Sequence, residues 1–89
     1  MTRRAAGLTE LGLAPGDRVR FRRGPGERWK PAVAERRERD GSVGLRDARG
    51  AARAIPVERI EVRSDGPRGG TTWEPLIERA ARTEQLRLL

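Results

Sequence analysis

The chain has 89 residues with neither Cys nor His, and its 20 Lys and Arg side chains against 13 Asp and Glu give a net charge of +7. The commonest nucleophile, general base and zinc ligands are therefore missing, so we expect a non-enzymatic binding protein without a cofactor or a metal. No apolar stretch is long enough to span a membrane and no signal peptide is evident, which favours a soluble protein of the cytoplasm.

The positive charge comes almost entirely from arginine, since only one of the basic residues is a lysine. A GC-rich bacterial genome also produces such a bias, so position along the chain is more informative than composition. Most of the excess falls in residues 1–39. We therefore expect a basic surface on one side of the fold, with attraction to polyanions.

Residues 1–15 form an N-terminal segment whose three leucines predict a short apolar turn against the rest of the fold. The first strand follows at residues 17–23, where apolar and basic side chains alternate. Val19 and Phe21 face the core in this pattern, because successive side chains of a strand point to opposite faces. The opposite face then carries a row of arginines, namely Arg18, Arg20 and Arg22.

A loop rich in Gly and Pro precedes the second strand, which is predicted at residues 29–39. Two registers fit this strand: either Val33 points inward together with Trp29 and Pro31, or Ala32 and Ala34 do. We expect Trp29 to plug the core rather than to offer an exposed stacking platform. The register also decides which arginines reach solvent beside the first strand, either Arg36 or Arg37 and Arg39.

Two hairpins are predicted next from their turn residues. Asp40-Gly41 favours a tight turn, since both of its positions need positive φ, and residues 43–46 alternate as a third strand. Residues 47–50 begin with Asp and end with Gly, as a type I turn prefers, and lead into a fourth strand at 51–55. The second, third and fourth strands are thus expected to pair in sequence order.

The fifth strand is predicted at residues 60–62, after a single helical turn at 56–59, because Pro56 cannot donate a hydrogen bond to a ladder. Residues 16–63 are therefore predicted to form a mainly β unit, a small barrel of five strands. A unit of this size has a modest core, so any element that packs on it adds useful burial.

The C-terminal part of the chain is predicted as a linker followed by a helix. Residues 64–71 are rich in Gly and read as the linker, and the helix is expected over 72–89 with Thr72 as its cap. Its apolar stripe must be covered either by the barrel or by a partner, so the chain is expected as a monomer or a weak homo-oligomer. The residues of this stripe are Trp73, Leu76, Ile77 and Ala80.

The order of strands and turns over residues 16–63 resembles that of the Src-homology-3-like small β-barrels, and most closely the Tudor group. The motifs that carry the resemblance are GDRV at 16–19, WKPAV at 29–33, DGSV at 40–43 and RDARG at 46–50. It implies recognition of methylated Lys or Arg tails in an aromatic cage or, in members without a cage, contacts with nucleic acid or other proteins. With only three aromatic residues, we expect this chain to act like the members without a cage.

The opening of the first strand also resembles the KOW motif of ribosomal and transcription-elongation proteins. The matching pattern is G-D-x-V-x-F-x-x-G at residues 16–24. That resemblance implies contacts with RNA or with a polymerase. Both resemblances therefore imply a binding module rather than an enzyme.

The arginine row of the first strand leads to the functional prediction, which is electrostatic binding of DNA or RNA with weak sequence preference. Alternate residues of a strand lie about 6.6–6.8 Å apart, so a row of guanidinium groups suits a phosphate backbone. The predicted site residues are Arg18, Arg20, Arg22, Arg23, Arg28, Lys30, Arg36, Arg37 and Arg39.

Two other outcomes are compatible with the same residues. The arginines can be neutralised by nearby carboxylates, which would leave little net field on the surface. Those carboxylates are Glu27, Glu35, Glu38 and Asp40. The alternative function is a protein-interaction module that docks an acidic peptide or a partner subunit, with no nucleic-acid role and no membrane contact.

Overall fold

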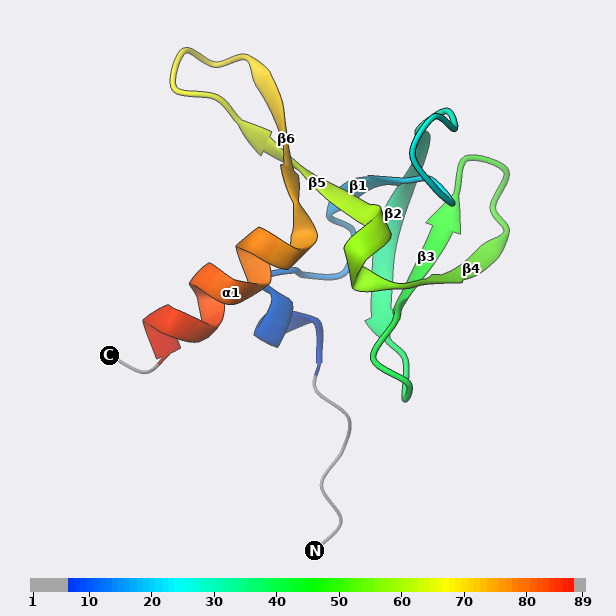
Figure 1. Ribbon diagram of the computed structural model, residues 1–89, viewed down its shortest axis with the longest axis horizontal. Helices are drawn as coiled ribbons and strands as arrows, with labels where there is room; N and C mark the ends of the chain where they lie inside the picture. Colours follow the sequence, from blue (N-terminus) through cyan, green and yellow to red (C-terminus); the bar gives the residue numbers. More distant parts are fainter. Residues whose placement is uncertain (1–6, 88–89) are drawn as a thin grey trace, which may run out of the picture.

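The computed structural model describes residues 7–87, which form one antiparallel sheet of six strands and a C-terminal helix (Figure 1). Along the sheet the strands lie in the order β4-β3-β2-β1-β5-β6. The elements in chain order are the 3-10 turn η1 (Leu8–Leu11), β1 (Arg18–Phe21), β2 (Lys30–Arg37), β3 (Val43–Asp47), β4 (Ala52–Ile55), the 3-10 turn η2 (Val57–Arg59), β5 (Ile60–Asp65), β6 (Thr71–Pro75) and the helix α1 (Leu76–Arg87). The first six and last two residues of the expected end segments lie outside the described residues.

The predicted class, mainly β with a C-terminal helix, is confirmed. Five strands and the helical turn before the fifth lie where the alternation and the turn residues predict them. The expected closure into a five-stranded barrel is wrong for the described residues, because β4 and β6 are the two edges of an open sheet. The sixth strand extends the sheet beyond β5, which is therefore paired on both sides.

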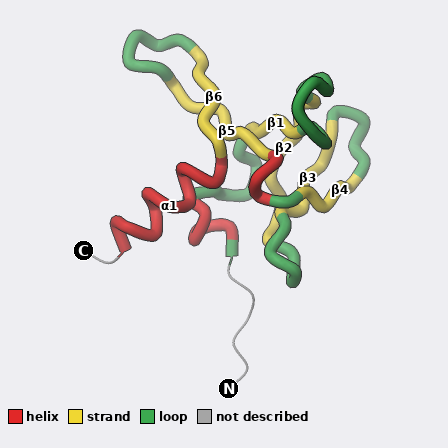
Figure 2. Tube along the Cα trace, viewed as in Figure 1, coloured by secondary structure: helices red, strands yellow, loops and turns green. Residues whose placement is uncertain are grey.

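This difference arises in the Gly-rich segment that was predicted to be a linker. β5 continues to Asp65, and a hydrogen bond of 2.5 Å from the Gly66 N–H to the Gly70 carbonyl closes a turn that leads back into β6. Gly69 has a φ of 82°, a left-handed conformation that glycine adopts without strain. Figure 2 shows the two strands joined by a loop tip that projects from the fold. Gly-rich composition suits a hairpin turn as well as a linker, so composition alone does not separate them.

The inward face of β2 carries Ala32 and Ala34, which decides between the two registers of this strand. Val19 of β1 lies opposite Ala32, and both side chains are buried. Val33 is only half-buried and Pro31 is exposed, and both belong to the outer face, so the register with Val33, Trp29 and Pro31 inward is wrong. A bulge just after Ala34 then shifts the pairing of β2 with β3.

One apolar core is formed by the inner face of the sheet together with η1 and α1, which lie side by side in Figure 1. Arg79 of α1 connects the helix to the residue directly after η1, since its Nε donates a hydrogen bond of 2.8 Å to the carbonyl of Gly12. Removing this apolar surface from water is the main stabilising contribution to the fold. The buried apolar residues are Leu8, Leu11, Leu13, Val19, Phe21, Ala32, Ala34, Val43, Leu45, Ile60, Val62 and Leu76.

The apolar stripe predicted for the C-terminal helix is divided between two elements. The helix begins at Leu76, directly after β6, and not at Thr72. Trp73 therefore belongs to β6, and Ile77 is 52% exposed. Leu76 is completely buried and Ala80 packs against the same core, so α1 packs on its own fold through these two residues.

Candidate functional site

Arg20, in the middle of β1, is held from three sides on the outer face of the sheet. Its guanidinium carbon lies 4.6 Å from the ring centroid of Trp29 and 4.5 Å from that of Trp73. Its Nε and Nη2 donate to Oε1 of Glu61 at 2.8 and 2.5 Å, because β1 and β5 pair with Arg20 opposite Glu61. A cation that stacks on two rings and pairs with a carboxylate stabilises the sheet and is not free for a ligand.

The expected row of free arginines on β1 is therefore interrupted at its centre. Arg18 is exposed and has no ion pair with any described residue. The guanidinium carbon of Arg22 lies 4.2 Å from the centroid of Trp29. The prediction that Trp29 plugs the core is wrong. Trp29 is half-buried outside the core, and the guanidinium groups of Arg20 and Arg22 stack on its ring.

Basic side chains gather where β1 ends and the chain turns toward β2. Four of them line one hollow of about 220 Å³ at this loop, with Glu27 as the carboxylate among its lining residues. A neighbouring hollow of about 420 Å³ shares two of these arginines and adds Arg59 from the end of η2. We call this group the loop cluster, and its members are Arg22, Arg23, Arg28, Lys30 and Arg59.

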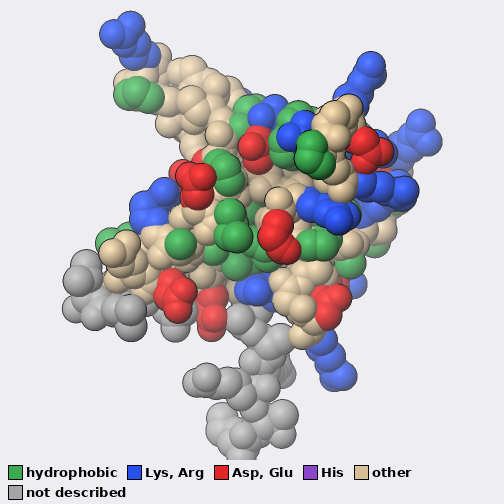
Figure 3. Space-filling model, in the orientation of Figure 1, with side chains coloured by type: hydrophobic (Ala, Val, Ile, Leu, Met, Phe, Trp, Pro, Cys, Tyr) green, Lys and Arg blue, Asp and Glu red, His purple; other side chains and the backbone are tan. Residues whose placement is uncertain are grey.

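The loop cluster is the most positive part of the candidate site. Its five cationic side chains form no ion pair with any residue that the structure describes. Figure 3 shows Lys and Arg side chains gathered over the β1–β2 loop and the neighbouring β3–β4 hairpin. Unpaired guanidinium groups close to one another attract phosphates more strongly than paired ones.

Arg59 was not among the predicted site residues, although it lies beside them. The backbone N–H of Arg22 donates to the carbonyl of Arg59 at 3.4 Å, and Phe21 pairs with Ile60 at the start of β5. Arg59 could have been predicted if the last predicted strand had been paired antiparallel with the first. Alternation along a single strand does not contain that information.

Three predicted site arginines lie at the other end of β2, away from the loop cluster. Arg36 and Arg37 follow Lys30 by six and seven residues along the strand, about 20 Å at the usual rise of a strand. Arg36 pairs with Glu38 at 3.2 Å, and the Nε of Arg37 donates to the carbonyl of Gly41 at 2.8 Å. The structure therefore does not bring Arg36, Arg37 and Arg39 together with the other site residues.

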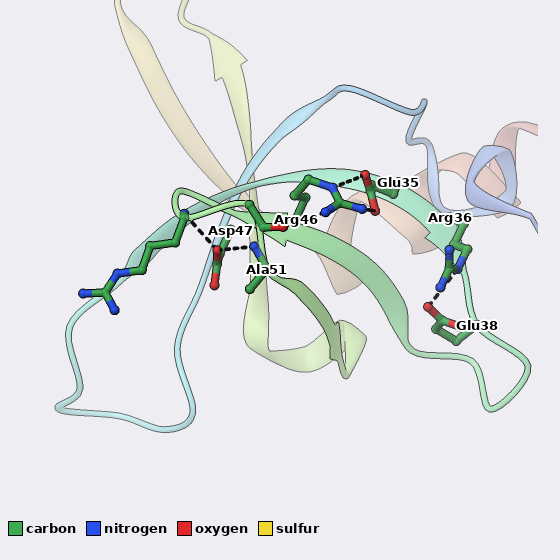
Figure 4. Close-up of polar contacts among 8 residues, drawn as sticks. Glu35, Arg36, Glu38, Arg46, Asp47 and Ala51 are labelled. Carbon is green, nitrogen blue, oxygen red and sulfur yellow. Dashed lines mark hydrogen bonds and ion pairs between the residues drawn. The ribbon is translucent and has the colours of Figure 1, made fainter.

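Glu35 and Asp40, two other carboxylates considered as partners, are both engaged by residues outside the predicted site, and Figure 4 shows Glu35 with Arg46. Glu35 accepts from the Nε of Arg46 at 2.7 Å, and this hydrogen bond holds the pKa of Glu35 below its ordinary value. Asp40 accepts from the hydroxyl and the N–H of Ser42 at 2.6 and 2.9 Å, which lowers the pKa of Asp40 as well. Among the predicted site arginines, neutralisation by a carboxylate thus applies to Arg36, through Glu38, and to Arg20, through Glu61, and not to the loop cluster.

Residues 7–87 contain no group of Asp and Glu placed to hold a metal ion. Within the same part of the chain, the helices are too short or too polar to cross a membrane. Comparisons with known proteins gave no match to a protein-family model, to a curated protein or to a solved structure.

Proposed function

We propose that this chain is a non-enzymatic protein that binds nucleic acid through the loop cluster. The observation that carries the proposal is the convergence of five cationic side chains without ion pairs among the described residues. The free carboxylates lining the same two hollows are Glu27 and Glu58, since Glu61 is already paired with Arg20. The local excess of positive charge favours a polyanion.

The binding is proposed to be mainly electrostatic, with weak sequence preference. Arginine and lysine bind phosphate oxygens, which position a protein on nucleic acid without reading its bases. The loop cluster presents no recognition helix, and Trp29 is covered by the guanidinium groups of Arg20 and Arg22. Both features favour contact with the backbone over contact with base edges.

A relationship with the Src-homology-3-like small barrels is also proposed rather than established. β1 to β5 follow one another along the chain with η2 directly before β5, which supports the resemblance drawn from the sequence. The open edge at β6 departs from a closed barrel. The proposed function does not depend on this relationship, because it rests on the charges of the loop cluster.

The direct test is to titrate dye-labelled duplex DNA, single-stranded DNA and an RNA hairpin with the protein at several salt concentrations. If five cations contact phosphates, log affinity for a duplex should fall with log salt with a slope of about −4 to −5. Affinity would then drop by about two to three orders of magnitude between roughly 50 and 200 mM salt. Absence of binding to all three probes at low salt would reject the proposal.

A matched pair of charge reversals locates the site. Arg28→Glu changes the loop cluster, and Arg68→Glu makes the same change of net charge in the turn between β5 and β6, where Arg68 is exposed. We expect Arg28→Glu to weaken binding about tenfold at low salt and to reduce the salt slope by about 1, whereas Arg68→Glu changes affinity less than about twofold. Equal losses would show that net charge alone acts and would contradict the loop cluster.

A further inference from the structure

A separate groove of about 510 Å³ lies on the outer face of the sheet. Pro31 and Val33 of β2 line it together with Trp73 of β6, and we call these three residues its floor. The turn after β3 and the start of β6 line it as well. The sequence places apolar side chains here because the residues of β2 that alternate with the buried alanines face outward. We call this feature the outer groove.

Unpaired positive charge borders the outer groove at Arg18 and Arg63. Both side chains are exposed and neither forms an ion pair with a described residue, although Arg63 donates to the Thr71 hydroxyl at 3.2 Å. Arg46 also lines the groove, but it is paired with Glu35. The complementary ligand therefore carries negative charge.

The remaining charge at the groove is compensated within the fold. The Oδ1 atom of Asp47 accepts from the backbone N–H groups of Arg49 and Ala51, each at 2.9 Å, and its Oδ2 accepts from Arg53 at 3.1 Å. The hydrogen bond from Ala51 is the main cause that lowers the pKa of Asp47. The carboxylate of Asp47 is thus neutralised and hydrogen-bonded within its own hairpin. The charges at the groove that have no ion pair with a described residue are those of Arg18 and Arg63, so the partner is expected to be negatively charged.

The floor of the groove selects between two anionic ligands, an acidic peptide and a nucleic-acid strand. Nucleic-acid bases stack on aromatic side chains, and their polar edges need hydrogen-bond partners. Burying those edges without hydrogen bonds costs free energy. Trp73 is the one aromatic residue that lines the groove, and its ring already carries the guanidinium of Arg20. The aliphatic surface of Pro31 and Val33 instead fits a large apolar side chain.

We propose that the outer groove binds an acidic segment of a partner protein. One large apolar side chain of that segment lies on Pro31 and Val33, and its carboxylates lie against Arg18 and Arg63. This site is distinct from the loop cluster, so it adds a second partner to the proposed nucleic-acid binding. A chain with both sites can hold a protein and a nucleic acid together.

The test uses three pools of dye-labelled ten-residue peptides and the full 89-residue chain. The first pool has Leu, Ile, Phe or Trp at its centre between glutamates, the second has Ser at its centre between glutamates, and the third has the apolar centre between lysines. We expect the first pool to bind at least about tenfold more tightly than either of the others, measured by dye anisotropy. Equal binding of the first and second pools would show charge attraction alone and would overturn the proposal.

Variants of the groove localise the binding. Val33→Asp places a carboxylate on the apolar floor and should weaken binding of the first pool by about tenfold or more. Arg18→Glu, at an exposed position, is the second variant, and Arg68→Glu is its control with the same change of charge. If both groove variants bind the first pool as well as the unchanged protein, or if oligothymidylate displaces the peptides competitively, the acidic peptide is the wrong occupant.

The two proposals can fail independently of one another. Arg28→Glu should weaken the binding of nucleic acid while the first peptide pool keeps its preference over the second. Val33→Asp should have the opposite effect, because Val33 does not line the hollows of the loop cluster. Circular dichroism of each variant confirms that it is folded before its affinity is interpreted.

Discussion

Arg20 and Arg23 lie three residues apart on the same segment, yet the fold uses them in opposite ways. Arg20 is paired with Glu61 and enclosed by Trp29 and Trp73, whereas Arg23 is exposed and has no ion pair with a described residue. The cause is the length of the ladder, since β1 ends at Phe21. Arg20 lies inside the ladder opposite Glu61 of β5, which supplies its partner, whereas Arg23 lies beyond the end of the ladder.

An arginine's own strand therefore does not decide its role. The neighbouring strands decide whether a partner is within reach. We distinguish the body of the fold, whose side chains pack on or pair with one another, from the loop cluster, whose cations have no ion pair with a described residue. Substitutions in the body should therefore change the free energy of unfolding and not the affinity for nucleic acid. Substitutions in the loop cluster should do the reverse.

The largest expected effect on the body comes from Leu76→Ala. Leu76 is completely buried at the start of α1, so the substitution leaves a cavity and should lower the free energy of unfolding by about 2–5 kcal/mol. Urea unfolding followed by circular dichroism measures it. The matched control is Ile77→Ala, at a position 52% exposed, which should change stability by less than about 0.5 kcal/mol. Similar losses in both variants would show that Ile77 is covered after all.

Arg20→Ala should have the next largest effect, because it removes two stacking contacts and a paired charge. We expect a loss of about 1–3 kcal/mol in the free energy of unfolding, with little change in the affinity for nucleic acid. Arg20→Lys keeps the charge but not the planar guanidinium, so it should recover only part of the loss. A variant that remains fully stable but binds nucleic acid weakly would show instead that Arg20 belongs to the binding site.

The smallest effect is the acid sensitivity contributed by Asp47. Hydrogen bonds lower its pKa below the ordinary value of 3.8, so its stabilising contribution is complete above that value and is lost as pH falls through the lowered pKa. Asn can still accept the two backbone hydrogen bonds but does not titrate in this range. The decrease in the urea midpoint between neutral and acid pH should therefore be smaller for Asp47→Asn. An unchanged decrease would assign the acid sensitivity to other carboxylates.

Much of the fold could be predicted from short-range patterns along the chain. Alternation placed Val19 and Phe21 in the core, and turn residues placed the first two hairpins. β6 was missed because a Gly-rich turn and a linker share one composition. The start of α1 was then misplaced, since Trp73 was assigned to the helix rather than to the strand before it.

The candidate site was harder to predict because its decisive contacts are distant in sequence. Glu61, which neutralises Arg20, lies 41 residues further along the chain, and the pairing of β1 with β5 brings it close. The same pairing brings Arg59 beside Arg22. Alternation could identify which arginines point outward, but it could not show which of them would find a partner there.

The stacking of Arg20 between Trp29 and Trp73 also gives the protein a built-in optical reporter. The chain contains two tryptophans and no tyrosine, so its ultraviolet emission arises from the two indoles that touch this guanidinium. Trp73 also lines the outer groove, and Trp29 borders the loop cluster. Changes in the colour or intensity of that emission can thus report unfolding and occupancy of either surface without any added dye.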